Sequence, residues 1–138
     1  FCGFGEPTMR ADMLVKTAEY IKQHSGMRIR LNTNGLVRLI HPDFDINRFK
    51  GLIDAVSISL NAPDAKRYNE VTRPSFGEKS FDAMIDFALD MKKICPSVGF
   101  TVVDILSDEE IEKCRRISEE LQIPLRVRTY ITDNESYT

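Results

Sequence analysis

The residues Gly5, Glu6 and Pro7, near the beginning of the chain, form a turn that could bind a ligand with an amino group. Gly3 and Gly5 stand on either side of Phe4, and glycines allow the backbone to approach a ligand closely. The Glu6 carboxylate follows, and Pro7 fixes the backbone where it leaves toward a helix. Carboxylate and carbonyl oxygens accept hydrogen bonds from an ammonium group. A plain tight connection between a strand and a helix is an equally good interpretation of this turn alone.

Polar side chains also stand where the predicted strands end. The strand at residues 28–32 runs into Asn34 and Gly35, and the strand at residues 55–60 runs into Asn61. Because ligands gather at the carboxyl ends of parallel strands, we expect one edge of the sheet to collect these groups. A plain Asn-Gly turn, and serines that only satisfy backbone or water, are the alternative interpretations. The polar residues at or near strand ends are Glu6, Asn32, Asn34, Ser57, Ser59, Asn61 and Asp104.

Strand-like and helix-like segments alternate along the chain. Apolar residues recur at helical spacing in residues 11–23, and Ser80 is predicted to cap a helix that Pro96 ends. Ser107 and Glu110 match the capping box at the start of a later helix. The predicted order is the end of a strand at Phe1, helix 11–23, strand 28–32, a short helix at 49–53 after Asp45, strand 55–60, a helix after Pro63, helix 81–95, strand 98–103, helix 111–121 and strand 125–129.

This alternation predicts an α/β fold with a parallel sheet and right-handed crossovers. The length of 138 residues suits one domain with a sizeable core, so we expect residues 1–138 to form a single domain. The chain begins without Met and with the hydrophobic end of a strand, which predicts a fragment truncated before Phe1. A missing first strand would expose a sheet edge, and we therefore expect self-association through that edge.

The composition favours some classes of protein over others. Nineteen basic and twenty-one acidic residues give a net charge of −2 without a basic run, so nothing indicates a nucleic-acid partner. No apolar run approaches the roughly 18 residues of a membrane span, and we expect a cytoplasmic protein without membrane contact. The three cysteines, Cys2, Cys95 and Cys114, lie far apart and fit reduced thiols. They contain no pair with the spacing of metal ligands.

Three motifs, in the right order, are similar to those of one enzyme superfamily. The segment Gly3–Pro7 resembles the Gly-Gly-Glu-Pro motif of radical S-adenosylmethionine enzymes, and Thr33–Gly35 resembles the tip of their third strand. Ser57–Asp64 is similar to their fourth strand and the turn after it, with Thr72–Pro74 in the following loop. The amino-acid sequences of the first motif and of residues 76–88 most resemble those of the small radical enzymes encoded near TatD-type hydrolases. Activases of the pyruvate formate-lyase type resemble the chain more loosely. The resemblance implies a partial (β/α) barrel, that is, an incomplete TIM-like barrel.

The resemblance also implies a set of residues that bind S-adenosylmethionine. The ammonium of the methionine moiety belongs at the Gly-Glu-Pro turn, and the ribose and carboxylate belong at the fourth strand. Val102 and Val103 would offer an apolar wall for adenine. Some activases carry an acidic residue where Asn32 stands and a lysine where Asn61 stands, so the ligand contacts can differ. The implied cofactor-binding residues are Gly3, Gly5, Glu6, Pro7, Asn32, Asn34, Ser57, Ser59, Asn61 and Val103.

One departure from the family concerns its 4Fe-4S cluster. The family holds this cluster with a C-x-x-x-C-x-x-C triplet, and this sequence contains no such triplet. The resemblance therefore implies that the cluster ligands lie upstream of Phe1. It implies that the full-length protein is an oxidoreductase that generates a 5'-deoxyadenosyl radical. The 138-residue chain itself would then be inactive. The substrate is unknown, although Arg126 and Arg128 alternate on the last strand and Arg128 could face an anionic substrate. One alternative is a non-catalytic α/β module for a nucleotide-like ligand or a partner protein. Another is an unrelated barrel lyase or aldolase, which would require a lysine or a pair of carboxylates at a strand end, and the sequence shows no strand-end lysine.

Overall fold

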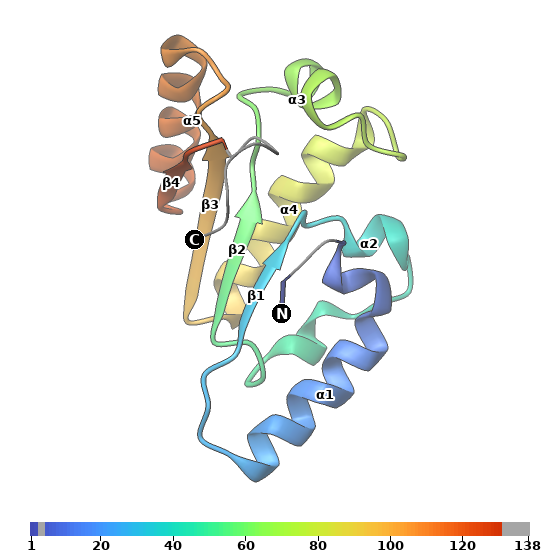
Figure 1. Ribbon diagram of the computed structural model, residues 1–138. Helices are drawn as coiled ribbons and strands as arrows, with labels where there is room; N and C mark the ends of the chain where they lie inside the picture. Colours follow the sequence, from blue (N-terminus) through green and yellow to red (C-terminus); the bar gives the residue numbers. More distant parts are fainter. Residues whose placement is uncertain (3–4, 131–138) are drawn as a thin grey trace.

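The computed structural model describes residues 1–2 and 5–130 as an α/β fold with a parallel sheet. The sheet runs in the order β1 (Arg30–Thr33), β2 (Ala55–Ser59), β3 (Ser97–Val103) and β4 (Leu125–Arg128), as Figure 1 shows. The helical elements are the 3-10 helices η1 (Pro7–Arg10) and η2 (Ile46–Phe49) and the α-helices α1 (Ala11–His24), α2 (Val37–Ile40), α3 (Ala65–Thr72), α4 (Lys79–Ile94) and α5 (Asp108–Leu121). The sheet is open, as the prediction of a partial (β/α) barrel requires. Gly3 and the polar residues after Tyr130 lie outside the described residues.

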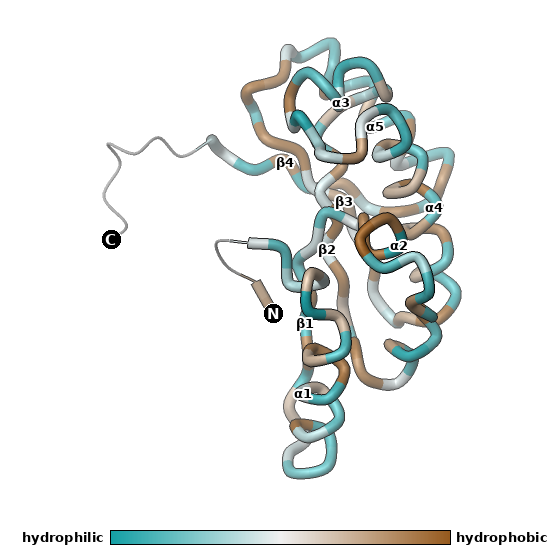
Figure 2. Tube along the Cα trace, turned by 90° about the vertical axis from the view of Figure 1, so that its right-hand side faces the viewer, coloured by the Kyte–Doolittle hydropathy of each residue, from teal (hydrophilic) through white to brown (hydrophobic). Residues whose placement is uncertain are grey.

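The helices cover one face of this sheet and leave the other face open. In Figure 2 the strands stand along the left side of the helical layer formed by α2, α4 and α5. Alternate residues of each strand point to opposite faces, and paired residues of parallel strands point the same way. The face toward the helices carries Leu31, Val56, Ile58, Phe100 and Val102, which are all nearly fully buried. The open face carries Asn32, Ser57, Ser59, Thr101, Val103, Arg126 and Arg128.

The first residue of the chain pairs with β1. The Phe1 amino group donates to the Arg30 carbonyl, and the Asn32 amide donates to the Phe1 carbonyl at 2.9 Å. These two bonds place Phe1 beside Leu31 in the pattern of parallel strands. The pairing agrees with the prediction that Phe1 belongs to the end of a strand. Self-association through the sheet edge stays a prediction, which light scattering across a dilution series would test.

One sequence-based placement of a helix cap, that of Ser80, differs from the structure. Helix α4 begins at Lys79, and Ser80 lies inside its first turn, where the hydroxyl is buried and has no hydrogen-bond partner among the described residues. Ser80 shares the 3.6-residue period of Met84, Phe87 and Met91, so the helix turns it toward the core instead of using it as a cap. Asp45, by contrast, does cap a short helix, since its carboxylate accepts from the Asn47 amide at 3.0 Å.

Within the described residues, no helix combines the length and the apolar character that a membrane crossing requires.

The Asp54 carboxylate connects the end of α1 to the strand β1. It accepts hydrogen bonds from the Lys22 ammonium at 2.6 Å and from the Ile29 amide at 2.7 Å. The hydrogen bond from Lys22, and then that from the Ile29 amide, lower the pKa of Asp54 below its ordinary value. The stabilising effect of this group is therefore present above the unfolded pKa of about 3.9 and is lost as the pH falls through the lower folded pKa.

We expect Asp54→Asn to lower the free energy of unfolding at pH 7 by about 1 kcal/mol, because a partly exposed charged acceptor is lost. The difference from the wild type should shrink as the pH falls below about 4. Urea denaturation at pH 7 and at pH 3 measures both effects. Asp43→Asn is the matched control, since Asp43 is exposed and forms no side-chain hydrogen bond with the described residues. A difference that stays constant with pH would contradict the role assigned to the Asp54 charge.

Candidate functional site

The Glu6 carboxylate joins the Gly-Glu-Pro turn to the end of β1. Its Oε1 atom accepts from the Thr8 amide at 3.2 Å, from the Thr8 hydroxyl at 2.8 Å and from the Thr33 hydroxyl. Its Oε2 atom accepts from the Asn34 amide at 2.7 Å. The first of these bonds caps η1, whose first residue is Pro7, because the leading amides of a helix have no partner inside it. Glu6 is therefore held in place from both its own segment and a strand about 27 residues away.

The turn after β1 is fixed by the residues beside Asn34. The Asn34 side-chain oxygen accepts from the Leu36 amide at 3.0 Å, and the Gly35 amide donates to the Thr33 hydroxyl at 3.1 Å. Gly35 has φ of +75°, and a Cβ atom there would lie 3.2 Å from the Met84 side chain. A glycine is needed here for both reasons. The Asn-Gly pair thus serves as a turn, and this turn aims the Asn34 amide at Glu6.

A cavity of about 410 Å³ lies beside Glu6 and reaches over the open face of the sheet. Three motifs that are far apart in the sequence contribute to it: the Gly-Glu-Pro turn, the end of β1 and the end of β2. Its size falls in the range of small-molecule sites. Its walls offer hydroxyl, amide, carboxylate and guanidinium groups, which suit a ligand with both charges and hydroxyls. The lining residues are Cys2, Gly5, Glu6, Asn32, Thr33, Asn34, Ser59 and Arg128.

The other predicted site residues that the structure describes do not line this cavity. Ser57 pairs with Asn32 on the open face, and Val103 is half-buried on the same face beside Arg128. Asn61 follows β2 with φ of +63°. The prediction that Val102 forms part of an apolar wall for adenine is wrong. Neighbouring residues of a strand alternate between the two faces of the sheet, and Val102 is fully buried on the face toward the helices.

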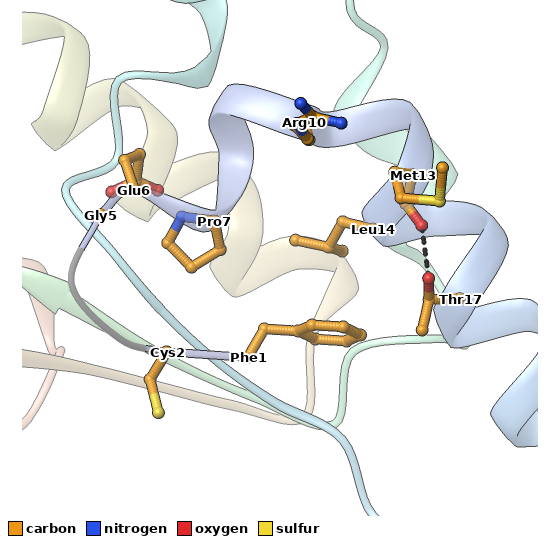
Figure 3. A pocket seen from close by; sticks show the side chains of 9 residues that line it. All are labelled: Phe1, Cys2, Gly5, Glu6, Pro7, Arg10, Met13, Leu14 and Thr17. Atoms are coloured by element: carbon orange, nitrogen blue, oxygen red, sulfur yellow. Dashed lines mark hydrogen bonds between the residues drawn. The ribbon is translucent and has the colours of Figure 1, made fainter.

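Two further cavities share Glu6. One, of about 340 Å³, lies between the beginning of the chain and α1, and Figure 3 shows Phe1 and Leu14 in its wall. Its lining is largely apolar and contains no residue of β1, β2, β3 or β4. It therefore suits S-adenosylmethionine, which has both charges and hydroxyl groups, less well than the cavity over the open face. The other, of about 450 Å³, lies at the rim and includes Asn34, Asn61 and Tyr68. Burial raises the pKa of the Tyr68 hydroxyl, which therefore stays protonated at neutral pH.

The cysteines do not form a cluster site. Cys2 is exposed at the cavity, whereas Cys95 and Cys114 are buried. Cys95 and Cys114 follow or belong to helices α4 and α5, on the far side of the sheet. Within residues 1–2 and 5–130, no group of histidine, cysteine and carboxylate side chains could hold a metal ion. A 4Fe-4S cluster therefore does not fit the residues described here.

We expect only Cys2 to react quickly with iodoacetamide in the folded chain at pH 8. Burial raises the pKa of Cys114 to about 11 and also raises the pKa of Cys95, so both side chains remain protonated thiols at pH 8. Burial also shields both sulfur atoms from the reagent. Mass spectrometry of tryptic peptides with and without urea measures the three rates. Labelling of Cys114 at the rate of Cys2 in the folded chain would contradict the burial.

Sequence reasoning missed Thr33 and Thr8 as site residues, although their hydroxyls hold the Glu6 carboxylate. Thr33 is a buried residue on the helix-facing side of β1, where a hydroxyl is unusual. A polar residue at an apolar position of a short strand was the available signal. The sequence also gave no reason to include Arg128 among the residues around Glu6, although Arg128 lines the same cavity from β4, at the opposite edge of the sheet.

One comparison with known proteins identifies the family of the chain. Residues 1–116 match the profile of the Radical SAM superfamily. No curated protein and no solved structure matches the chain. The matched region includes the Gly-Glu-Pro turn, the strands β1, β2 and β3, and the residues Asn34 and Asn61 that follow β1 and β2. The chain therefore belongs to the Radical SAM superfamily.

Proposed function

We propose that the open face of the sheet binds S-adenosylmethionine in the cavity beside Glu6, as part of a radical enzyme. The observation that carries this proposal is the meeting of Gly5, Glu6, Asn32, Asn34 and Ser59 around one cavity of suitable size. These residues come from the Gly-Glu-Pro turn and from the ends of β1 and β2, which lie far apart in the sequence. Membership in the superfamily supports the same ligand.

The groups in the cavity suit the parts of this ligand. The Glu6 carboxylate, whose oxygens already accept four hydrogen bonds within the chain, complements an ammonium group by its negative charge. The carbonyl groups of its turn can accept the hydrogen bonds of that ammonium group. Asn32 and Ser59 both donate and accept, which suits carboxylate and ribose oxygens. Val103 adds an apolar surface on the same face, at the rim end of β3. The ligand would lie across the carboxyl ends of the strands, with its amino acid end near β1 and its adenosine over β2 and β3.

When bound in an enzyme of this superfamily, S-adenosylmethionine supplies the 5'-deoxyadenosyl group that abstracts hydrogen from a substrate. The residues of this chain would hold and orient the cofactor and would shield one side of it from water. The cluster that starts the chemistry does not fit the described residues. We propose that the 138-residue chain binds the cofactor without catalysing the reaction, and that it resembles the TatD-associated proteins most.

Isothermal titration calorimetry of the chain with S-adenosylmethionine tests this function. We expect weak but saturable binding, because hydrogen bonds alone must offset the ordering of the ligand. Ser59→Ala should weaken binding by about threefold to tenfold, as expected for one hydrogen bond. Ser97→Ala is the matched control, since Ser97 begins β3 and points to the same open face from the opposite end of the strands. Absence of saturable binding, or equal effects of both variants, would contradict the proposal.

A further inference from the structure

Two arginines stand together on the open face of the sheet. Arg126 and Arg128 occupy alternate positions of β4, and both are exposed on the side that carries Thr101 and Val103. Two residues of a strand span roughly 6.6 Å, so both guanidinium groups can reach one small ligand. Neither forms an ion pair or a side-chain hydrogen bond with the residues that the structure describes. Their cationic charge faces solvent over the cavity side of the sheet.

The other arginines near packed elements are used differently. Arg38 pairs with Asp90, Arg48 pairs with Asp12, and Arg67 pairs with Glu110 and Glu70. These three guanidinium groups lie among the helices and loops, where they link elements of the outer layer. The pair on β4 links no elements within the described residues, so its charge has no evident structural use.

The carboxylates nearest to this pair have other partners. Glu6 lines the same cavity as Arg128, but its two oxygens already accept four hydrogen bonds from Thr8, Thr33 and Asn34. The Asp104 carboxylate accepts from the Tyr130 amide at 2.7 Å and lies outside ion-pair distance of either guanidinium. The other side chains of the open face near β4 are uncharged. A ligand with an oxyanion would therefore find two donors that form no ion pair with a carboxylate of the described residues.

We propose that Arg126 and Arg128 bind an oxyanion of the substrate, either a carboxylate or a phosphate. This inference rests on the proposed function, because S-adenosylmethionine with its amino group near Glu6 would place its adenosine over β2 and β3. The arginine pair on β4 then stands beyond the adenosine, at the side from which a substrate approaches. Planar guanidinium groups bind carboxylate and phosphate with two parallel hydrogen bonds. A small anion fits better than nucleic acid, because the chain has a net charge of −2 and no basic run.

The inference is tested with inorganic phosphate and with acetate as probes, titrated into the 15N-labelled chain at constant ionic strength. We expect saturable shifts of the β4 amides and of the arginine side-chain N–H signals for at least one probe. Arg128→Gln should weaken that binding by about tenfold, as expected for a charged hydrogen bond. Arg128→Lys keeps the charge, loses the fork geometry and should recover part of the affinity. Arg116→Gln is the control, since Arg116 is exposed on α5 and should change the affinity less than twofold.

Titration with S-adenosylmethionine and with its decarboxylated analogue separates the two sources of a carboxylate. If Arg128→Gln leaves the affinity for both unchanged, the anion belongs to the substrate, as proposed. If the variant weakens only S-adenosylmethionine, Arg128 binds the carboxylate of the cofactor, and the substrate assignment is overturned. Linear shifts without saturation, or equal shifts in Arg128→Gln, would also overturn it. Phosphate binding as expected in a chain that fails to bind S-adenosylmethionine supports the oxyanion site and overturns the proposed function instead.

Discussion

Replacement of Glu6 by glutamine is expected to weaken binding of S-adenosylmethionine by about tenfold to one-hundredfold. The carboxylate is the acidic group in the wall of the cavity, and its charge complements the ligand ammonium. The same change should lower the free energy of unfolding by about 1–3 kcal/mol, because an NH₂ group cannot accept from the Asn34 amide or the Thr33 hydroxyl. Calorimetry measures the affinity, and urea denaturation measures the stability.

The variant Thr33→Val separates the two roles of Glu6. It removes a hydroxyl that donates to Glu6 and accepts from the Gly35 amide, while the charge of Glu6 stays. We expect a similar loss of stability and a loss of affinity below about threefold. Equal losses of affinity in Thr33→Val and Glu6→Gln would mean that Glu6 acts by positioning the turn. Unchanged binding by Glu6→Gln would remove Glu6 from the site.

After anaerobic reconstitution with iron and sulfide, the 138-residue chain is expected to hold no stoichiometric 4Fe-4S cluster. Ligation of such a cluster requires several cysteines close together. Cys2 is exposed at the cavity, but Cys95 and Cys114 are buried on the helical side of the sheet. Iron and sulfide analysis measures the cluster content. Chromatography after dithionite reduction should detect no 5'-deoxyadenosine. Its formation by this chain would contradict the proposal that the 138-residue chain is inactive.

The control for this result is a longer polypeptide in which a segment with the C-x-x-x-C-x-x-C triplet precedes Phe1. We expect it to bind the cluster, to show the brown colour of the bound cluster and to release 5'-deoxyadenosine and methionine after reduction. The residues of the cavity would be unchanged between the two proteins. A longer protein that holds a full cluster and yet releases no 5'-deoxyadenosine would contradict the proposed function, while leaving the family membership of the chain intact.

Much of the fold could be predicted because its signals are local. The helical spacing in residues 11–23 and the capping box at Ser107 are properties of a few consecutive residues, and the structure has α1 at Ala11–His24 and the complete capping box on α5. The prediction for Ser80 was wrong because a serine near a helix start is ambiguous by type. The position of Ser80 in the apolar period of the helix would have placed it inside.

The sequence by itself determined which residues stand at the ends of the strands, since strand ends and turns follow from residue types over short windows. In a parallel sheet these ends share one edge, so the gathering of Glu6, Asn34 and Ser59 was predictable from the alternation of elements. The tertiary structure alone decided that Thr33 and Asn34 hold the Glu6 carboxylate, and that Arg128 reaches the same cavity from β4. These contacts depend on the register and curvature of segments far apart in the chain, and no local pattern of residues encodes either of them.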